Sequence, residues 1–366
     1  MHCSVLQFGG GRFLRSFVDL FVEQARGEGQ DVGDVVVVQS TVSSRAEYFN
    51  NQSNGYHVLI RGIVDGHHVE RVEQVRVVRR AIVADEAWEE VQSVALQESI
   101  KWIVSNATEA GYALEVDDSI AKPRSFPAKV TSILFSRYNA GLSGMKILPC
   151  ELLTKNGKRL HELVCKQAQT WNLSDHFFDW LACECIWADT LVDRIVSRPP
   201  LDHPLFEQDR LLAVAEPFAF WGIQAKDEMP FFPHPSISIV DDLTPYAMRK
   251  LRIFNGAHTA LVCRAMPLGF VTVREAMEDG AIRSWLERLL FDEIVPVVES
   301  IAVDAKEFAD SVLERLANPY LDHKFEDISL YHETKIKTRL QPTYEEFIKL
   351  KGHAPALLEE MLLISR

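Results

Sequence analysis

The sequence predicts an α/β protein whose N-terminal part alternates strands and helices and whose C-terminal part is mostly α-helical. The first observation is a series of short apolar runs, such as DVVVV at 34–38, separated by amphipathic stretches with helical spacing. Such runs are typical of parallel strands buried on both faces, and their alternation with helices indicates a parallel sheet. The second observation is a proline-rich stretch between 199 and 235, followed by helical spacing almost to the end.

The length supports a division into two domains, because 366 residues exceed the usual size of one. We assign 1–200 to the strand/helix domain and 201–240 to a β-rich or irregular segment that crosses between domains. We assign 241–366 to a helical domain that carries substrate and catalytic residues.

Composition excludes several classes of protein. The net charge of -13 argues against a general nucleic-acid binder, although a locally basic pocket remains compatible with an anionic substrate. No apolar run reaches about 18 residues, so we expect no membrane span. Met1 stands almost directly before the first predicted strand, so the cytoplasm is the expected location.

The six cysteines form no CxxC pair, so we expect reduced thiols and no metal site.

The first strand, turn and helix favour a dinucleotide-binding domain of the Rossmann type. Residues 5–8 form the predicted strand, Gly9-Gly10-Gly11 the turn, and 12–24 an amphipathic helix. Glycines in this turn let backbone N–H groups approach a pyrophosphate. The third glycine of GxGxxG is absent, since Leu14 stands in its place. Taken alone, the motif fits an ordinary strand–helix turn equally well.

The second strand leaves the choice of cofactor open. A ribose-binding acid often ends this strand. Here 34–38 is followed by Gln39-Ser40-Thr41, with neither an acid nor an adjacent arginine. The missing acid weakens the usual argument for NAD, so this strand does not decide between NAD and NADP.

The remaining elements follow in order. A hairpin at 55–78 is inserted into the first domain. Further elements are helix 85–97, strand 102–106, helix 126–138, strand 146–150 and helix 158–168, then helices 245–265, 272–278, 281–290, 292–301, 304–316, 344–351 and 354–364. Asn106 ends its strand, a position that suits contacts to a cofactor or substrate, or equally an Asx turn.

The predicted helix 245–265 carries the residues best suited to chemistry. Asn255 and His258 lie three apart and share a face, and Lys250 lies about 80° round the same side at 100° per residue. An amine, an amide and an imidazole suit proton transfer at a substrate oxygen, with Lys250 as acid/base if its pKa is lowered. The plainer alternative is a basic helix end with a half-buried histidine.

Four segments in the right order resemble the polyol-specific long-chain dehydrogenases, the mannitol dehydrogenase family. They are GGGRFLR at 9–15, TLVDRIV at 190–196, KLRIFNGAHT at 250–259 and RLANP at 315–319. Together they span about 5–342. The resemblance implies a catalytic set of Lys250, Asn255 and His258.

The same resemblance implies a cofactor site and a substrate site. The cofactor residues are Phe8, Gly9, Gly10, Gly11, Arg12, Phe13, Asn106, Thr108 and Glu109, and the substrate residues are Asp193, Arg315, His323, Lys335 and Arg339. Asp193 could instead form a salt bridge with Arg194, and the other four could be solvated charges.

Within the family, several segments resemble the tagaturonate reductase (altronate oxidoreductase) branch. These include PCELL at 149–153, FPAK at 126–129 and KIKTR at 335–339. Leu152 stands where the mannitol and fructuronate branches carry an asparagine. The branch implies NAD-dependent interconversion of D-tagaturonate and D-altronate, without a metal.

The alternatives are a fructuronate or mannitol-type enzyme, or a non-catalytic nucleotide-binding homologue. Relatives continue beyond the position of Arg366, so the helical domain is expected to be shortened. We expect a monomer or weak oligomer that binds a sugar acid, with no nucleic-acid or membrane partner.

Overall fold

The computed structural model describes residues 2–40, 44–225 and 231–364. By compactness the chain divides into two units. The first comprises 1–60, 71–215 and 219–243, and the second comprises 61–70, 216–218 and 244–366. The tip of the predicted hairpin therefore belongs to the second unit.

The first unit is built on a six-stranded parallel sheet of order β5-β2-β1-β6-β7-β8. Its strands are β1 Cys3–Phe8, β2 Asp34–Gln39, β5 Val78–Val83, β6 Trp102–Ser105, β7 Lys146–Pro149 and β8 Ile186–Trp187. The predicted α/β class is confirmed. In a parallel sheet with β1 between β2 and β6, the carboxyl ends of these three strands form the place where such folds bind ligands.

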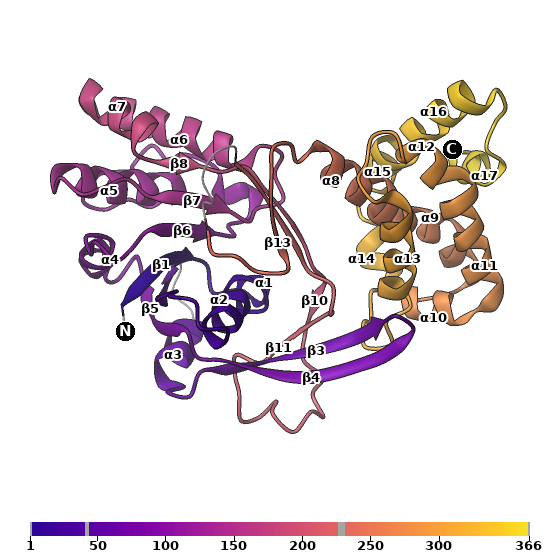
Figure 1. Ribbon diagram of the computed structural model, residues 1–366, viewed down its shortest axis with the longest axis horizontal. Helices are drawn as coiled ribbons and strands as arrows, with labels where there is room; N and C mark the ends of the chain where they lie inside the picture. Colours follow the sequence, from indigo (N-terminus) through magenta and orange to yellow (C-terminus); the bar gives the residue numbers. More distant parts are fainter. Residues whose placement is uncertain (1, 41–43, 226–230, 365–366) are drawn as a thin grey trace. The chain divides into compact units, whose positions relative to one another are not determined.

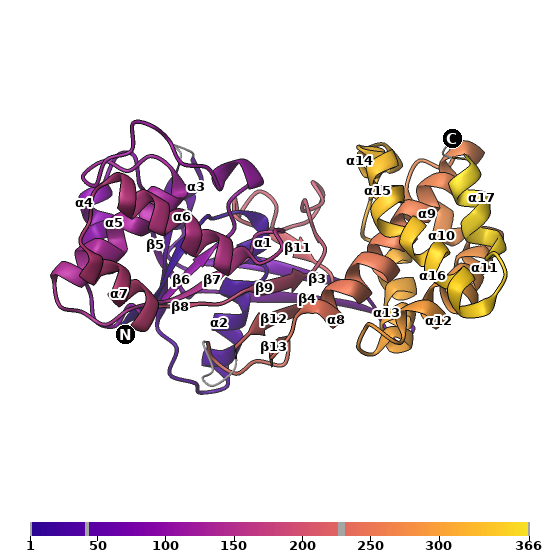
Figure 2. The same cartoon turned by 90° about the horizontal axis from the view of Figure 1, so that it is seen from above.

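Helices cover both faces of this sheet (Figure 1). They are α1 Arg12–Arg15, α2 Val18–Gly27 and α3 Ser44–Asn51, and α4 Trp88–Ala95, α5 Phe126–Asn139, α6 Asn156–Thr170 and α7 Asp175–Cys183. Successive β1 residues enter different cores: Val5 packs with α2, whereas Leu6 packs with α4, α5 and α6. This alternation explains why the strands are apolar throughout. Figure 2 shows α2 on the opposite side of the sheet from α5 and α6.

Two smaller sheets complete the strands. One has the order β10-β11-β3-β4, and the other has the order β13-β12-β9. The strands are β3 Tyr56–Val64, β4 His67–Val75, β9 Thr190–Asp193, β10 Val196–Ser197, β11 Ala213–Ala215, β12 Phe220–Gln224 and β13 Ile237–Val240. The predicted hairpin is therefore confirmed as β3 and β4, and the predicted β-rich segment contains β11, β12 and β13. A 3₁₀ turn, η1 Glu109–Gly111, follows β6.

The second unit is helical, as predicted. Its elements are α8 Thr244–Arg249, η2 Lys250–Phe254, α9 Asn255–Ala265, η3 Met266–Leu268, α10 Val273–Glu278, α11 Gly280–Arg288, η4 Leu289–Ile294, α12 Val295–Val298, α13 Ala305–Leu316, α14 Phe325–Ser329, α15 His332–Arg339, α16 Gln341–Lys351 and α17 Ala356–Ile364. Helix α9 is buried on nearly every side and contacts α10, α11, α14, α15 and α17. It is the central helix of this unit (Figure 1).

Two predicted helices depart from regular α-helix. The prediction of one continuous helix at 12–24 was wrong, whereas the predicted helix 245–265 runs without a break through α8, η2 and α9. The helix expected at 12–24 breaks at Ser16 and Phe17, where the backbone leaves helical dihedral angles. The helix expected at 245–265 contains a π-helical turn, η2. The π-helical turn begins at Lys250, one of the residues that the sequence singles out for function.

Candidate functional site

The glycine turn after β1 has the shape that a phosphate requires. Gly9 has a φ of 112°, which residues with side chains rarely adopt. A Cβ at Gly10 would lie 2.8 Å from Cε2 of Phe49 and 3.2 Å from Nε2 of Gln39, so this position is closed to larger residues. A Cβ at Gly11 would meet nothing within 4 Å, and no side chain caps α1 there. The turn can therefore receive an oxygen-rich ligand at exposed backbone N–H groups.

The missing third glycine is explained by the break in the helix. Leu14 is buried, and its Cδ1 would lie 3.5 Å from a Cβ at Gly9. Helix α1 ends at Arg15 and α2 begins at Val18. Because α1 is a single turn, the chain changes direction after Arg15. A longer helix would pack closely against the strand and would require a glycine where Leu14 stands, and this requirement is absent here.

Arg15 fixes the glycine turn by a hydrogen bond to the Gly10 carbonyl, a role that the sequence analysis did not assign. Arg15 is 4% exposed, and its guanidinium donates from Nη1 to the Gly10 carbonyl at 2.6 Å and from Nε to the Leu211 carbonyl at 3.0 Å. Burial lowers the pKa of Arg15 to about 10. A buried guanidinium donating to two carbonyls fixes the position of both chain segments.

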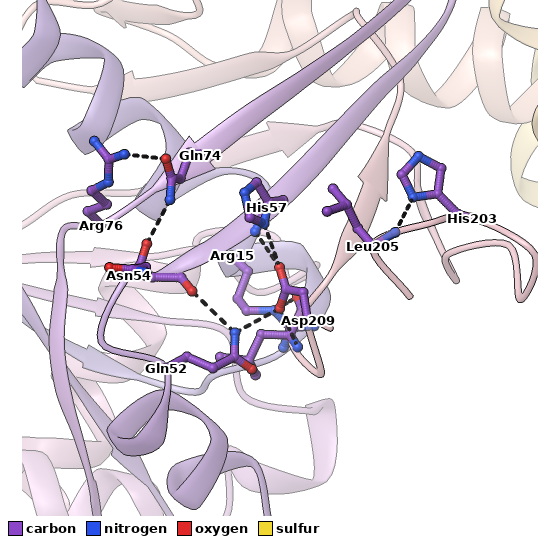
Figure 3. A network of polar contacts seen from close by, with 11 residues as sticks. Arg15, Gln52, Asn54, His57, Gln74, Arg76, His203, Leu205 and Asp209 are labelled. Carbon is purple, nitrogen blue, oxygen red and sulfur yellow. Dashed lines mark hydrogen bonds and ion pairs between the residues drawn. The ribbon is translucent and has the colours of Figure 1, made fainter. Parts of the chain in front are cut away.

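Asp209 extends this anchor (Figure 3). One carboxylate oxygen accepts from the backbone N–H of His57 at 2.6 Å and lies 3.1 Å from His57 Nδ1. The other accepts from Gln52 Nε2 at 2.8 Å and from the Leu211 N–H at 2.9 Å. Since Arg15 donates to Leu211, one network joins the glycine turn, Gln52 directly after α3, β3 and the segment before β11.

Asn106 lies beside the glycine turn, as its predicted role requires. Its N–H donates to the Phe8 carbonyl at 3.1 Å, and its side chain donates to the Cys150 carbonyl at 2.7 Å. A Cβ at Gly9 would lie 3.6 Å from the Asn106 carbonyl oxygen. The carboxyl ends of β1, β6 and β7 are thus joined at one point.

A buried carboxylate that sequence reasoning missed holds the loop after Asn106. Glu151 Oε1 accepts from the Ala107 N–H at 2.8 Å, and Oε2 accepts from the Tyr112 hydroxyl at 2.9 Å. Burial raises the pKa of Glu151, although these hydrogen bonds act in the opposite direction. The only signal in the sequence was an acid directly after a strand. The neighbouring Leu152, which stands where the mannitol and fructuronate branches carry an asparagine, is 80% exposed.

The other predicted cofactor residues differ in accessibility. The Phe8 ring packs against Phe126 at 5.2 Å between centroids, so Phe8 offers only its backbone to a ligand. Phe13 stacks on Phe17 at 4.8 Å. Arg12 and Thr108 are exposed, and the side chain of Glu109 lies outside the described part of the structure.

In the second unit, η2 sets the relation between Lys250 and Asn255. The Asn255 N–H donates to the Lys250 carbonyl, a hydrogen bond that spans five residues. In an α-helix five residues turn a side chain by about 140°. A π-helical turn instead brings the fifth residue nearly above the first, and such turns are frequent at functional sites. Lys250 therefore lies closer to the face of Asn255 than regular helical spacing predicts.

His258 is a neutral imidazole with one nitrogen committed. Its Nδ1 lies 3.1 Å from the Phe254 carbonyl, so Nδ1 carries the hydrogen and Nε2 the lone pair. Burial, followed by the charge of His323, lowers the pKa of His258 to about 3. The two imidazole rings are 5.9 Å apart. His258 can therefore accept a hydrogen bond at Nε2 at any pH near neutrality.

The arginines that flank Lys250 serve the packing of the helix. Arg249 stacks on the rings of Tyr246 at 5.0 Å and Phe308 at 4.7 Å. Arg252 donates to the Thr343 hydroxyl at 2.7 Å.

Three predicted substrate residues lie in the same unit as the predicted catalytic residues. Arg339 Nη1 lies 3.2 Å from Thr259 Oγ1 and 3.5 Å from the Asn255 carbonyl. Lys335 donates to the Ile328 carbonyl at 2.8 Å. Burial and the charge of Arg339 lower the pKa of Lys335. His323 lies beside His258, and burial and the charge of Arg315 lower the pKa of His323, so its imidazole is mainly neutral near neutral pH.

Arg315 already has a carboxylate partner. Its Nε and Nη2 donate to the two oxygens of Glu216 at 2.9 and 2.8 Å, and the side chains are 3% and 1% exposed. The guanidinium also lies over the rings of Phe218 and Phe254, at 4.1 and 3.9 Å. Its predicted contact with substrate stays a prediction beside this structural role.

Asp193 belongs to the first unit, where it is buried at the end of β9. The neighbouring Arg194 donates from Nη1 to the Ser16 carbonyl at 2.8 Å. The alternative of a salt bridge between Asp193 and Arg194 stays open.

All six cysteines are free thiols. Across residues 2–40, 44–225 and 231–364, His, Cys, Asp and Glu side chains form no group of three or more suited to a metal ion. Of the helices in those same ranges, none combines the length and apolar character needed to cross a bilayer.

Both parts of the chain match domains of one known protein family. Residues 3–231 match the mannitol dehydrogenase Rossmann domain, and 242–363 match the mannitol dehydrogenase C-terminal domain. The altronate oxidoreductase of Halalkalibacterium halodurans is 37% identical over 97% of this chain and 72% of its own length. That of Bacillus subtilis is 36% identical over 97% of this chain and 77% of its own.

Solved structures share the fold. A D-sorbitol dehydrogenase in substrate-free form superposes with a TM-score of 0.84 at 21% identity, over 100% of this chain and 80% of its own. The Pseudomonas fluorescens mannitol 2-dehydrogenase, a ternary complex with NAD and D-mannitol, gives 0.77 at 18% identity, over 100% and 78%. With both family domains matched and these relatives aligned over nearly its whole length, the chain belongs to the mannitol dehydrogenase family of oxidoreductases.

Proposed function

We propose that this chain interconverts D-tagaturonate and D-altronate with NAD(H). The observation that carries the proposal is a pair of cations on α15, Arg339 and Lys335, in the same unit as Asn255 and His258. An open-chain sugar acid has a carboxylate that such cations recognise, whereas an uncharged polyol has none. The identity to altronate oxidoreductases over 97% of the chain supports this substrate class.

The first unit would hold the dinucleotide. The glycine turn fits the pyrophosphate, and Asn106 lies next to it. We assign this contact to Phe8, Gly9, Gly10, Gly11, Arg12, Phe13, Asn106, Thr108 and Glu109. When bound, NAD(H) supplies or accepts the hydride at its nicotinamide ring. Arg15 and Glu151 act on the cofactor indirectly, by positioning the turn and the loop after β6.

The residues of η2 and α9 would handle the proton and the substrate oxygen. Lys250 gives a proton to the carbonyl oxygen during reduction and takes it back during oxidation. Asn255 donates a hydrogen bond to the oxygen as negative charge develops. His258 accepts a hydrogen bond at Nε2 from a neighbouring substrate hydroxyl, since its Nδ1 is held by Phe254.

We assign the substrate carboxylate to the positive charges of Arg339 and Lys335, with His323 as a hydrogen-bond donor. Arg339 is the best placed of these, because its contact with the Asn255 carbonyl ties it directly to the catalytic helix. Arg315 contributes chiefly through its positive charge, which helps to keep His258 neutral. Asp193 is assigned to a hydrogen bond with substrate or to proton relay.

The test is a substrate panel. Purified protein is mixed with NADH and tagaturonate, fructuronate or fructose, and the absorbance of reduced nicotinamide is followed. We expect turnover of tagaturonate above both others. Turnover of fructose would contradict the carboxylate requirement, and a preference for fructuronate would move the assignment to that sugar acid.

A pair of variants tests the carboxylate site. We expect Arg339→Met to raise the KM for tagaturonate at least about tenfold with a smaller change in kcat, because uniform binding is lost. Lys337→Met is the matched control, since Lys337 is an exposed cation on the same helix, α15. Equal effects of the two variants would refute a specific carboxylate contact.

A further inference from the structure

Two buried side chains hold successive carbonyl groups of the glycine turn. Arg15 Nη1 donates to the Gly10 carbonyl at 2.6 Å, and Gln7 Nε2 donates to the Gly9 carbonyl at 3.1 Å. The C=O and N–H of one planar trans peptide unit point in opposite directions. Fixing these two carbonyls therefore also fixes the N–H groups of Gly10 and Gly11, which a pyrophosphate at this turn would meet.

Both side chains act on one carboxyl group, that of Asp19 in the first turn of α2. Asp19 and Gln7 are completely buried. Burial raises the pKa of Asp19 to about 7, and Tyr56, Gln7 and Arg15 act in the opposite direction, in that order. A carboxyl group in this range is present in both protonation states near neutral pH. The support of the glycine turn thus contains a group that changes its charge there.

Tyr56, the first residue of β3, joins Asp19 to the segment that carries Arg15. Its hydroxyl lies 2.8 Å from Asp19 Oδ2 and 3.2 Å from the Arg15 carbonyl oxygen. Burial, and next the charge of Asp19, raise the pKa of Tyr56, so the hydroxyl keeps its hydrogen. That single hydrogen has two acceptors within reach.

The charge of Asp19 decides which acceptor receives the hydrogen. An ionised Asp19 takes it, because a charged acceptor makes the stronger hydrogen bond. A protonated Asp19 instead donates to the Tyr56 oxygen, which leaves the hydroxyl hydrogen for the Arg15 carbonyl. Protonation of Asp19 therefore adds a hydrogen bond to the residue that holds Gly10.

Electrostatics acts in the same direction. The guanidinium of Arg15 places a positive charge under the turn, and Asp19 is among the groups that act on its pKa. An ionised Asp19 offsets this charge and adds a negative one close to a site for an anion. Protonation removes the negative charge, and the effect is large because the group is buried and poorly screened by solvent.

We propose that Asp19, acting through Tyr56 and Arg15, positions the glycine turn, so that the chain binds the pyrophosphate of a dinucleotide more tightly when Asp19 is protonated. This inference rests on the dinucleotide-binding part of the proposed function and does not depend on the sugar substrate. Asp19 and Tyr56 are positioning residues, since both are buried and act on the turn from within the protein. By linkage, a bound pyrophosphate strengthens the binding of the proton to Asp19 by the same factor.

Other charged or titratable groups lie on the elements around Asp19. Asp209 acts on Tyr56, and its Oδ2 lies 3.1 Å from His57 Nδ1. His234 stacks on a ring of α2, and burial lowers its pKa to about 4, so it stays neutral near neutral pH. Arg194 donates to a backbone carbonyl between α1 and α2. The imidazole of His57 is therefore the group whose titration has to be separated from that of Asp19.

The test is a calorimetric titration of the protein with ADP-ribose at about pH 6 and about pH 8. ADP-ribose carries the pyrophosphate and has no group that titrates in this range. It lacks the nicotinamide, so groups that would meet the nicotinamide or the sugar do not enter the measurement. We expect binding to be at least about fivefold weaker at the higher pH. Titrations in buffers of different ionisation enthalpy should find uptake of up to about half a proton at about pH 7.

Three variants identify the group responsible. Asp19→Asn keeps the shape of the side chain without a titrating proton, so it should bind ADP-ribose with neither the pH dependence nor the proton uptake. Tyr56→Phe removes the shared hydrogen and should weaken binding at about pH 6 by about threefold or more. His57→Gln is the control for titration elsewhere in the network, and it should keep the pH dependence.

The remaining outcomes overturn the inference in distinguishable ways. Binding by the wild-type protein that is independent of pH, or tighter at the higher pH, would refute it without any variant. An unchanged pH dependence in Asp19→Asn would assign the titration to another group, and its loss in His57→Gln would assign it to the imidazole. Absence of ADP-ribose binding at every pH would refute dinucleotide binding itself, which the proposed function also requires.

Discussion

Replacing Arg315 by methionine should destabilise the second unit more than any loss of a surface charge. The guanidinium makes two hydrogen bonds to Glu216, and both side chains are nearly inaccessible to water. Breaking a buried pair by removing one partner costs about 3–5 kcal/mol, because a charge is left buried without compensation. An exposed pair contributes only about 0.2–1 kcal/mol. The rings of Phe218 and Phe254 add to the loss, by about 0.5–2 kcal/mol for cation–π contacts.

The assay is a double-variant cycle. Urea unfolding is measured for Arg315→Met, Glu216→Gln and the two combined, and hydrogen exchange of α13 peptides identifies unfolding of the second unit. The combined variant should lower the free energy of unfolding by about 2 kcal/mol less than the sum of the two single variants, since neither charge is then left unpaired. Arg283→Met is the matched control, because its partner Glu287 lies four residues along the same helix and both are exposed. We expect that control to cost about 0.5 kcal/mol or less.

Two results would refute this reasoning. A cost of Arg315→Met below about 1 kcal/mol would mean that the pair behaves as a surface contact. Strict additivity of the two single variants would mean that Arg315 and Glu216 act independently.

Three further predictions concern single side chains. Lys250→Ala should lower kcat by about 10²–10⁴-fold, as expected for loss of a general acid/base, while fluorescence titration should find NADH affinity within about twofold of wild type; retained activity would exclude the assigned role. Burial lowers the pKa of His258 from 6.5 to about 3, so between these pH values only the unfolded chain takes up a proton at this residue. Unfolding measurements should therefore find that the free energy of unfolding falls as the pH falls through this window, by up to about 1.4 kcal/mol per pH unit. The loss should be smaller in His258→Gln. Burial raises the pKa of Asp19 from 3.8 to about 7, so between these pH values the folded chain keeps this carboxyl protonated and the unfolded chain does not. The free energy of unfolding should therefore fall as the pH rises through this window. Asp19→Asn should make it less dependent on pH there, and an unchanged dependence would contradict a raised pKa at Asp19.

The sheet and its cofactor turn were readable from the sequence because local patterns determine them. The apolar run at β2 has both faces buried, and glycines stand where a positive φ or a close approach requires them. The residues chosen for the catalytic helix follow from spacing along one element, and Asn255 and His258 need no tertiary information to share a face.

The break between α1 and α2 could not be predicted from periodicity. Apolar residues continue through the break, because Phe17 is buried as fully as the helical residues around it. Periodicity records which side chains are buried and not whether the backbone hydrogen bonds continue. The same limitation concealed η2, since an i to i+5 turn has no composition of its own.

Taken by itself, the sequence determined the order of the elements, the glycine turn and the set of residues on the helix that we propose to be catalytic. Only the tertiary structure decided which charges meet. Arg315 pairs with Glu216 across 99 positions, and Arg12 lies within electrostatic range of Arg45 and Arg198. The physical reason is that backbone and burial patterns are properties of neighbouring residues, whereas the partner of a charged side chain is set by which elements pack together.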